Sequence, residues 1–294
     1  MTAPADVSAL AACSIEELGE RLAQRGYFAE QGLLTAIHLA LVLSRPLALE
    51  GEPGVGKTEV AKVLADVLGR ELIRLQCYEG LDAGQALYEW DYPKQLLHAR
   101  VAEAEGREVG ELYAERFLLE RPLLRALRAG AGAVLLIDEI DRADSEFEAF
   151  LLEFLSDFQI TIPELGTVRA TRSPVVVLTS NRTRELHDAL KRRCLYHWIP
   201  FPDAERERRI LRARAPGLDE AAAATLVEAI KSIRGLALAK RPGIAETIDW
   251  AHGAAVLASE GARWPEALQR SLGLLLKDQE DLERVEARHE LFAI

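Results

Sequence analysis

The chain has 294 residues, of which 49% are hydrophobic and 28% are charged, and its formal net charge is −11. This is the composition of an ordinary globular protein, long enough for a large domain with a smaller companion. No apolar run could span a bilayer, and the N-terminal stretch has acids but no basic cluster, so we expect a cytoplasmic protein without a transmembrane segment or signal peptide. The acidic charge and the scattered basic residues also argue against nucleic-acid binding.

The cysteines and histidines predict no metal or disulfide chemistry. Cys13, Cys77 and Cys194 form no CxxC pair, and the six histidines show no HExxH spacing. A zinc site and a disulfide framework are therefore not expected. We expect three buried, reduced thiols, which is how such cysteines usually pack.

Strand and helix patterns alternate along the first two thirds of the chain. Apolar residues at helical spacing occupy 15–43 with a break near Gly26, and a short apolar strand over 47–49 ends at Gly51. Further patterns predict helices over 59–68 and 145–158, mostly helical structure over 79–131, a hairpin over 159–171, and strands over 71–77, 134–137, 175–178 and 195–199. This alternation predicts an α/β fold, in which helices cover both faces of a parallel sheet.

The strand signals stop at Pro202. Beyond it the sequence shows only helical patterns, over 205–214, 219–233, 244–259 and 265–277. We therefore expect two domains, an α/β domain over 1–202 and an all-helical lid over 203–294.

A phosphate-binding loop follows the first predicted strand. Gly51–Thr58 matches the pattern Gly-x-x-x-x-Gly-Lys-[Ser/Thr] in full, with a strand before it and a helix after it. The glycines let backbone N–H groups turn toward an anion, and the helix adds its positive N-terminal end. We expect Lys57 to reach the β- and γ-phosphates of ATP and Thr58 to bind Mg²⁺. The predicted nucleotide-binding residues are Glu52, Pro53, Gly54, Val55, Gly56, Lys57, Thr58 and Glu59.

Two acids stand at the end of the apolar strand over 134–137. In a sheet of this kind we expect Asp138 and Glu139 to lie beside the phosphate-binding loop. Asp138 would hold the Mg²⁺ shell, mainly through water, and Glu139 would orient the water that attacks the γ-phosphate. The Asp-x-x-Gly and Asn-Lys-x-Asp patterns of small GTPases are missing here, and metabolite kinases usually lack such a glutamate. ATP hydrolysis is therefore the favoured reaction.

Further polar residues are candidates for a hydrolytic site. Asn181 follows the strand over 175–178, where an amide can contact the γ-phosphate and the attacking water, although Asn is also a common turn residue. Arg192 and Arg193 stand just before the last strand, where an arginine can enter the ATP site of a neighbouring subunit and neutralise transition-state charge. Which arginine does so stays open, and a solvated basic patch is the alternative.

The chain resembles an AAA+ ATPase over nearly its whole length. The resemblance rests on five features in this order: the phosphate-binding loop, the Asp-Glu pair, the Asn-tipped strand, the arginine pair and the helical lid. Residues 137–143, Ile-Asp-Glu-Ile-Asp-Arg-Ala, are similar to the acidic motif of the MoxR family, which often has Asn where Asp141 stands. The hairpin over 159–171 and an insert over about 80–115 fit the same family. Residues 76–93 look most like its CoxD-like branch, which is associated with the maturation of molybdenum–copper carbon monoxide dehydrogenase.

The resemblance implies a homo-oligomer, a hexameric ring that uses ATP and Mg²⁺ to remodel a client metalloenzyme, with a partner protein that contains a von Willebrand A domain. No metal-delivery residues stand out, so the protein would move its client and not carry the metal. One departure concerns a sensor arginine, which the family commonly places after a Ser-Pro at the start of a lid helix. Here Arg241 precedes Pro242, so it is either a γ-phosphate contact or an ordinary helix flank.

Several alternatives stay open at this point. The aromatic residues Tyr88, Trp90 and Tyr92 of the insert would either grip a client, face a pore or pack against their own domain. The chain would also fit an AAA+ ATPase that remodels another protein, a nucleic-acid machine of the same ATPase class, or a nucleotide-gated scaffold that rarely turns over. The acidic charge disfavours the nucleic-acid machine.

Overall fold

The computed structural model describes residues 13–106, 112–215 and 217–292, which form two compact units. We call the first the sheet unit; its described residues are 13–18, Gln31–Glu50 and Val60–Trp198 without the gap at 107–111. We call the second the helical unit; its described residues are Gly19–Glu30, Gly51–Glu59 and 199–292 without 216. Residues 107–111 of the expected insert and residues 1–12 of the N-terminal stretch lie outside the described residues.

The sheet unit is built on five strands in the order β2-β5-β8-β1-β9. Their bounds are β1 (Leu47–Gly51), β2 (Glu71–Gln76), β5 (Ala133–Asp138), β8 (Val175–Ser180) and β9 (Leu195–Ile199). The pairings β1–β8, β8–β5 and β5–β2 are parallel, and Leu135 of β5 pairs with Ile73 on one side and Val176 on the other. Every residue of β5 is buried, as expected for a central parallel strand with both faces covered. The predicted α/β fold with a parallel sheet is confirmed.

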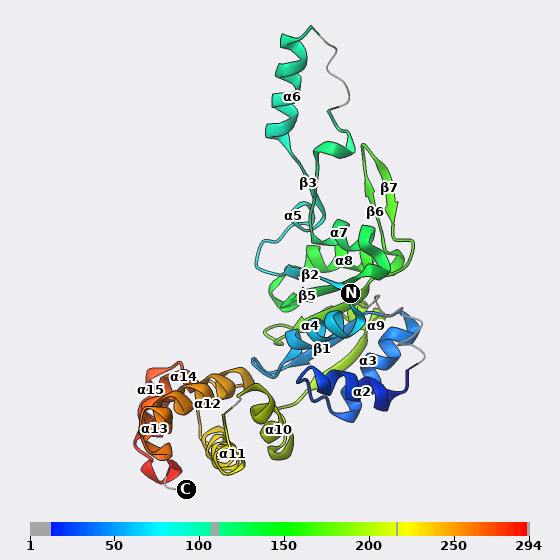
Figure 1. Ribbon diagram of the computed structural model, residues 1–294. Helices are drawn as coiled ribbons and strands as arrows, with labels where there is room; N and C mark the ends of the chain where they lie inside the picture. Colours follow the sequence, from blue (N-terminus) through cyan, green and yellow to red (C-terminus); the bar gives the residue numbers. More distant parts are fainter. Residues whose placement is uncertain (1–12, 107–111, 216, 293–294) are drawn as a thin grey trace. The chain divides into compact units, whose positions relative to one another are not determined.

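Helices pack against this sheet through apolar faces (Figure 1). Those that share a core cluster with the strands are α7 (Pro122–Ala129), α8 (Ser145–Asp157) and α9 (Asp188–Arg193). The chain also forms α2 (Ile15–Gln24), α3 (Gln31–Leu43), α4 (Lys57–Leu68) and, before β5, the short turn η2 (Gly130–Gly132). One core cluster joins Leu123 of α7 and Phe154 of α8 to Ile137 of β5. Burying side chains of this size stabilises the fold by about 1.5–3 kcal/mol each. This packing therefore holds the helices against the sheet that carries the strand ends.

The insert contains a small ladder that the sequence did not predict. Its elements are α5 (Ala83–Leu87), β3 (Tyr88–Trp90), α6 (Tyr92–Ala104), η1 (Glu115–Phe117) and β4 (Leu118–Glu120), and β3 pairs antiparallel with β4. Strands of three residues are too short to show alternation, which is why mostly helical structure was expected. Trp90 is buried and contacts Tyr88 and Tyr113 edge-on, whereas Tyr92 is exposed at the start of α6, which stands away from the sheet in Figure 1.

The predicted hairpin over 159–171 is confirmed. Strands β6 (Gln159–Ile162) and β7 (Gly166–Arg169) pair antiparallel, with Ile160 opposite Val168. Gly166 has φ +84°, a left-handed conformation that glycine adopts without strain. Ile162 is buried in the main core, which anchors the hairpin to the sheet unit.

The described residues from 200 to 292 contain helices and no strand. The helices are α10 (Ala204–Arg214), α11 (Glu220–Arg234), α12 (Ile244–Ser259), α13 (Trp264–Arg270), α14 (Leu272–Leu275), α15 (Gln279–Glu286) and η4 (His289–Phe292). They enclose a core of their own around Trp250, whose indole N–H donates to the Leu268 carbonyl at 3.0 Å. Within the described ranges, none of the helices has the length and apolarity needed to cross a bilayer.

Candidate functional site

The phosphate-binding loop connects β1 to α4, as the sequence predicts. Gly54 and Gly56 have φ values of +77° and +94°, which allow the tight turn of this segment. The Lys57 amine donates to the carbonyl oxygens of Gly51 at 2.7 Å and Glu52 at 2.8 Å, so it lies folded against its own loop. Thr58 is the second residue of α4. A turned glycine backbone with a buried lysine fits a nucleotide phosphate group.

The phosphate-binding loop belongs to the helical unit, and two other segments of that unit contact it. The Ile244 N–H at the start of α12 donates to the Gly54 carbonyl at 2.9 Å. Glu59 forms an ion pair with Arg214 of α10 at 2.5 Å. Arg241 is exposed and lies three residues before Ile244, so the segment that carries it is held near the loop by backbone contacts.

A segment far upstream in the sequence also reaches the loop, and no sequence pattern predicted this contact. The Tyr27 ring lies 3.8 Å from where a Cβ atom on Gly56 would stand, and burial raises the pKa of this phenol. The next residue, Phe28, receives the Arg209 guanidinium over its ring at 4.6 Å. The loop is therefore lined by helical-unit residues from both ends of the chain.

The acids of the sheet unit stand at the carboxyl end of β5. Asp138 is buried, and its carboxylate accepts hydrogen bonds from Thr179 Oγ1 at 2.6 Å and from Arg74 Nε at 3.0 Å. Arg74 lies on β2, the neighbouring strand, and the sequence did not single it out. A buried carboxylate needs polar partners, and Thr179 and Arg74 supply them for Asp138. An ionised carboxylate is a ligand that Mg²⁺ prefers.

Glu139 is held at the turn that follows β5. Its backbone is left-handed, with φ +54°, and its N–H donates to Thr179 Oγ1 at 2.9 Å. Its carboxylate accepts hydrogen bonds from Gln76 Nε2 at 3.1 Å and Asn181 Nδ2 at 3.4 Å, and pairs with Arg142 at 2.9 Å. The structure therefore brings the predicted Glu139 and Asn181 together at the ends of adjacent strands.

Asp141 fixes the backbone that carries Asn181. Within η3 (Ile140–Arg142), its carboxylate accepts from the Asn181 N–H at 3.2 Å, the Thr183 N–H at 2.9 Å and the Thr183 hydroxyl at 2.7 Å. Burial alone would raise the pKa of Asp141, but these hydrogen bonds lower it. The sequence singled out Asp141 only because the resembled family often has Asn at this position. Its role as a hydrogen-bond acceptor could not be predicted, because it depends on tertiary structure.

The Asn-tipped strand β8 is the direct neighbour of the acid-tipped strand β5. The expectation that Asp138 and Glu139 lie beside the phosphate-binding loop stays a prediction. Strand β8 lies between β5 and β1, with Leu49 opposite Thr179 in register. Strand β8 therefore pairs with β1 on one side and with β5 on the other.

Arg192 and Arg193 end α9 and have different surroundings. The Arg193 guanidinium donates to Ser156 Oγ at 2.7 Å and to the Ala189 carbonyl at 3.3 Å. The Arg192 carbonyl accepts from Arg45 Nη2 at 2.7 Å. Among the described residues we find no hydrogen bond or ion pair to the Arg192 guanidinium, which is exposed. The Arg193 guanidinium is thus held by two hydrogen bonds within its own chain, and in this it differs from the Arg192 guanidinium.

A buried glutamate positions the segment that leads into α9. Glu148 of α8 is fully buried, accepts from the His187 N–H at 2.9 Å, and pairs with Arg184. Arg184 Nε in turn donates to the Ala143 carbonyl at 3.0 Å. These bonds tie the turn before α9 to the turn after β5.

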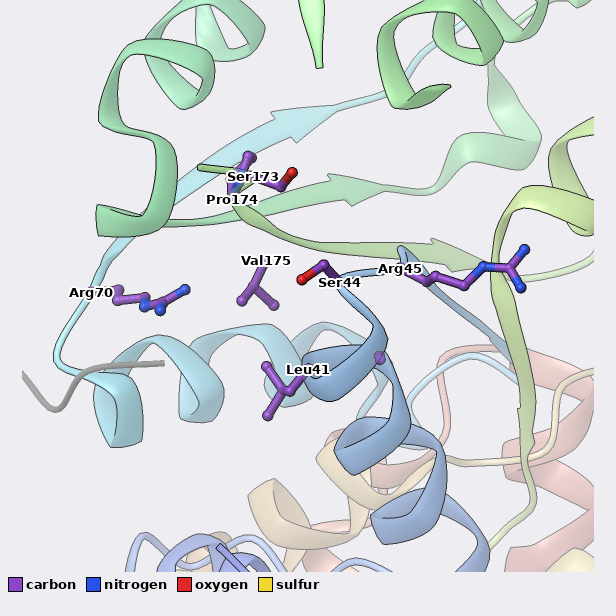
Figure 2. Close-up of a pocket in the computed structure, with 8 residues that line it drawn as sticks. Leu41, Ser44, Arg45, Arg70, Ser173, Pro174 and Val175 are labelled. Carbon is purple, nitrogen blue, oxygen red and sulfur yellow. The ribbon is translucent and has the colours of Figure 1, made fainter. Parts of the chain in front are cut away.

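A small pocket lies at the opposite edge of the sheet and holds none of the predicted site residues. It is lined by Ala40, Leu41, Ser44, Arg45, Arg70, Ser173, Pro174 and Val175. Figure 2 shows Arg70 directed toward Val175 at the start of β8, whereas Arg45 extends away from it. The acids and Asn181 are at the carboxyl ends of the strands, which is where open α/β sheets bind ligands.

A Gly-Lys-Thr loop after one parallel strand, with an Asp-Glu pair ending another, defines a P-loop nucleotide-binding protein. Residues 46–194, just over half of the chain, match the AAA domain (dynein-related subfamily). The chain belongs to this family of AAA+ ATPases, which bind ATP with Mg²⁺.

Curated relatives agree with this class. The chain is 32% identical over 131 residues to the chaperone protein ClpB of Mycoplasma genitalium, a match that covers 45% of this chain and 16% of that protein. It is 29% identical over 132 residues to the Clp protease ATP-binding subunit ClpL of Lactococcus lactis, covering 45% of this chain and 15% of that one. The chain thus spans about a sixth of the curated relatives it matches.

Two solved structures of Thermotoga maritima RuvB mutants share the fold. One has a TM-score of 0.54 at 18% identity, covering 95% of this chain and 80% of that chain. The other has a TM-score of 0.52 at 18% identity, covering 95% and 79%. At this identity the likeness shows the fold alone.

Proposed function

We propose that this protein is a Mg²⁺-dependent ATPase that acts as a chaperone on a metalloenzyme. Membership of the AAA family supports ATP as the nucleotide. The observation that carries hydrolysis is the contact between Glu139 and Asn181, because a carboxylate and an amide that meet at adjacent strand ends suit the task of holding one water molecule. A cytoplasmic location, expected from the sequence, is part of the same proposal.

In this proposal each polar group has one task. Lys57 binds the β- and γ-phosphates, and Thr58 and Asp138 hold Mg²⁺, directly or through water. Bound Mg²⁺ supplies positive charge beside the phosphates. Glu139 accepts a hydrogen bond from the attacking water and draws its proton away, and Asn181 orients that water.

We extend the proposal to a homo-oligomeric ring, hexameric by resemblance, in which a neighbour supplies an arginine. Arg192 is the better candidate because Arg193 already donates to Ser156 and Ala189. Moving Arg193 into another subunit would break both of these hydrogen bonds, each with a net contribution of about 0.5–1.5 kcal/mol. Arg241 stays a weaker candidate for a γ-phosphate contact.

We place the protein in the MoxR family, in its CoxD-like branch. The support is the resemblance of residues 137–143 and 76–93, together with the hairpin β6–β7 at the place where the family has one. The client would be molybdenum–copper carbon monoxide dehydrogenase, and the partner a protein with a von Willebrand A domain. The local similarity to ClpB agrees with a protein-remodelling role.

A capture experiment tests the client. Full-length protein carrying Glu139→Gln, which should bind ATP without hydrolysing it, is incubated with ATP and Mg²⁺ in a lysate of the source cells, and retained proteins are identified. A Lys57→Ala variant is the matched control because it should not hold ATP. Retention of a metalloenzyme subunit only by Glu139→Gln supports the proposal. Retention of DNA or a DNA-processing protein, with ATP hydrolysis that DNA stimulates and salt suppresses, would replace it with a nucleic-acid machine.

A further inference from the structure

The start of α12 and the phosphate-binding loop meet backbone to backbone. The Ile244 N–H donates to the Gly54 carbonyl at 2.9 Å, which joins the first turn of the helix to the middle of the loop. Gly243, the N-cap of α12, lies against Gly54 and the Pro53 carbonyl. Both segments belong to the helical unit. This contact therefore connects the lid helices to the loop through backbone atoms, with the Glu246 carboxylate beside both glycines.

Neither glycine can be replaced without moving the other segment. A Cβ atom on Gly243 would stand 2.6 Å from Gly54 Cα and 2.8 Å from the Pro53 carbonyl oxygen. Both neighbours are backbone atoms, which cannot rotate away as a side chain can. Gly243 itself has φ −83° and ψ −176°, an extended conformation open to any residue. Glycine is therefore required at 243 for close approach and not for backbone conformation.

Gly243 is rigidly held from the helical side. Its N–H donates to Glu246 Oε2 at 3.1 Å, and its carbonyl accepts from the Thr247 hydroxyl at 2.8 Å. The preceding Pro242 carbonyl accepts from Arg234 Nε at 2.9 Å, and Arg234 makes two further bonds, both of 2.9 Å, with the buried Glu207. A side chain added at 243 would therefore displace the loop, because the helical side is fixed by a buried ion pair.

We propose that Gly243 is a positioning residue for nucleotide binding, which holds the phosphate-binding loop in its binding form through Gly54. The backbone amides of this loop must converge on the phosphates, and a shift of the loop by a fraction of an ångström misaligns them. The lid then controls nucleotide affinity through a steric contact and one hydrogen bond. This inference rests on the proposed function, because it concerns the affinity of the same loop.

The first test compares two glycine substitutions. Gly243→Ala should weaken binding of a fluorescent ADP analogue with Mg²⁺ by about tenfold, as expected when one backbone hydrogen bond and the loop geometry are lost. Gly273→Ala is the matched control, because a Cβ there meets no atom within 4 Å, and it should bind as wild type does. Urea unfolding without nucleotide is measured for both, since a purely structural residue would change the free energy of unfolding and leave affinity unchanged.

A second pair of variants decides the matter if Gly243→Ala does not fold. Ile244 is the first residue of α12, where proline is well tolerated, so Ile244→Pro removes the N–H that donates to Gly54 and keeps the helix. Ile244→Ala keeps the N–H and removes the buried side chain. Weaker nucleotide binding in Ile244→Pro than in Ile244→Ala supports the inference. Equal affinities in this pair, or wild-type affinity in folded Gly243→Ala, would overturn it. Wild-type protein that binds no nucleotide would instead overturn the proposed function on which the inference rests.

Discussion

Asp141 is a buried side chain that holds the backbone of the proposed site in place. It accepts three hydrogen bonds from Asn181 and Thr183, on the segment that follows β8. Asp141→Ala should free this segment and lower the ATPase rate at saturating ATP by about tenfold, since Asn181 loses its fixed orientation. Steady-state kinetics check this. A variant with the wild-type rate would show that Asp141 has no positioning role.

The lowered pKa of Asp141 predicts a pH dependence. Because its carboxylate is stabilised in the folded state, its contribution to stability is full above the unfolded pKa of about 3.9 and is lost as the pH falls through the lower folded value. Wild type should therefore have a higher free energy of unfolding than Asp141→Asn at pH 7, by about 1–3 kcal/mol. Urea unfolding at several pH values should show this difference shrinking below about pH 4. A difference that grows on acidification contradicts the assignment.

Two cysteines should resist thiol reagents. Burial raises the pKa of Cys77 to about 12, helped by the nearby Asp138, and burial raises the pKa of Cys194 to about 12. At pH 8 only roughly one thiol in 10⁴ would be ionised, and the thiolate is the reactive form. In a Cys13→Ser background, folded protein should react far more slowly than urea-unfolded protein. Equal rates in the two states would show that these thiols are accessible.

At the scale of elements, a buried acid holds α9 in place. Glu148→Ala leaves the His187 N–H and Arg184 without their acceptor, so the free energy of unfolding should fall by about 3–5 kcal/mol. Glu146→Ala, an exposed position on the same helix, is the matched control and should stay within about 0.5 kcal/mol of wild type. Urea unfolding measures both, and similar losses in the two variants would refute this role.

The elements also show what the sequence could predict. The core strands and the hairpin were predicted because continuous apolar runs and turn residues are local signals. The β3–β4 ladder was missed because each strand has three residues and its partner lies about thirty residues away. The contacts of Arg74, Gln76 and Asp141 with the site were also missed, because they depend on which strands become neighbours. The full strand order was not predicted for the same reason, since nothing local places β8 between β1 and β5.

At the scale of the whole molecule, the proposed ring predicts complementation between subunits. Lys57→Ala should lose nucleotide binding and Arg192→Ala should lose transition-state stabilisation, so each alone should be nearly inactive. Mixtures should recover part of the ATPase rate, because some interfaces then combine an intact loop with an intact arginine. Arg193→Ala is the comparison and should retain most activity. If no mixing ratio restores hydrolysis, Arg192 does not act on a neighbour's nucleotide.

The account depends most on Glu139 as the residue that activates water. The direct measurement is phosphate release from ATP with Mg²⁺ by wild type and Glu139→Gln, with ATP affinity determined for both and Glu146→Gln as an exposed control on α8. We predict that Glu139→Gln binds ATP as wild type does and hydrolyses it about 10²–10⁴ times more slowly, while the control is unaffected. Equal hydrolysis by wild type and Glu139→Gln, or no Mg²⁺-dependent hydrolysis by wild type, would contradict the account.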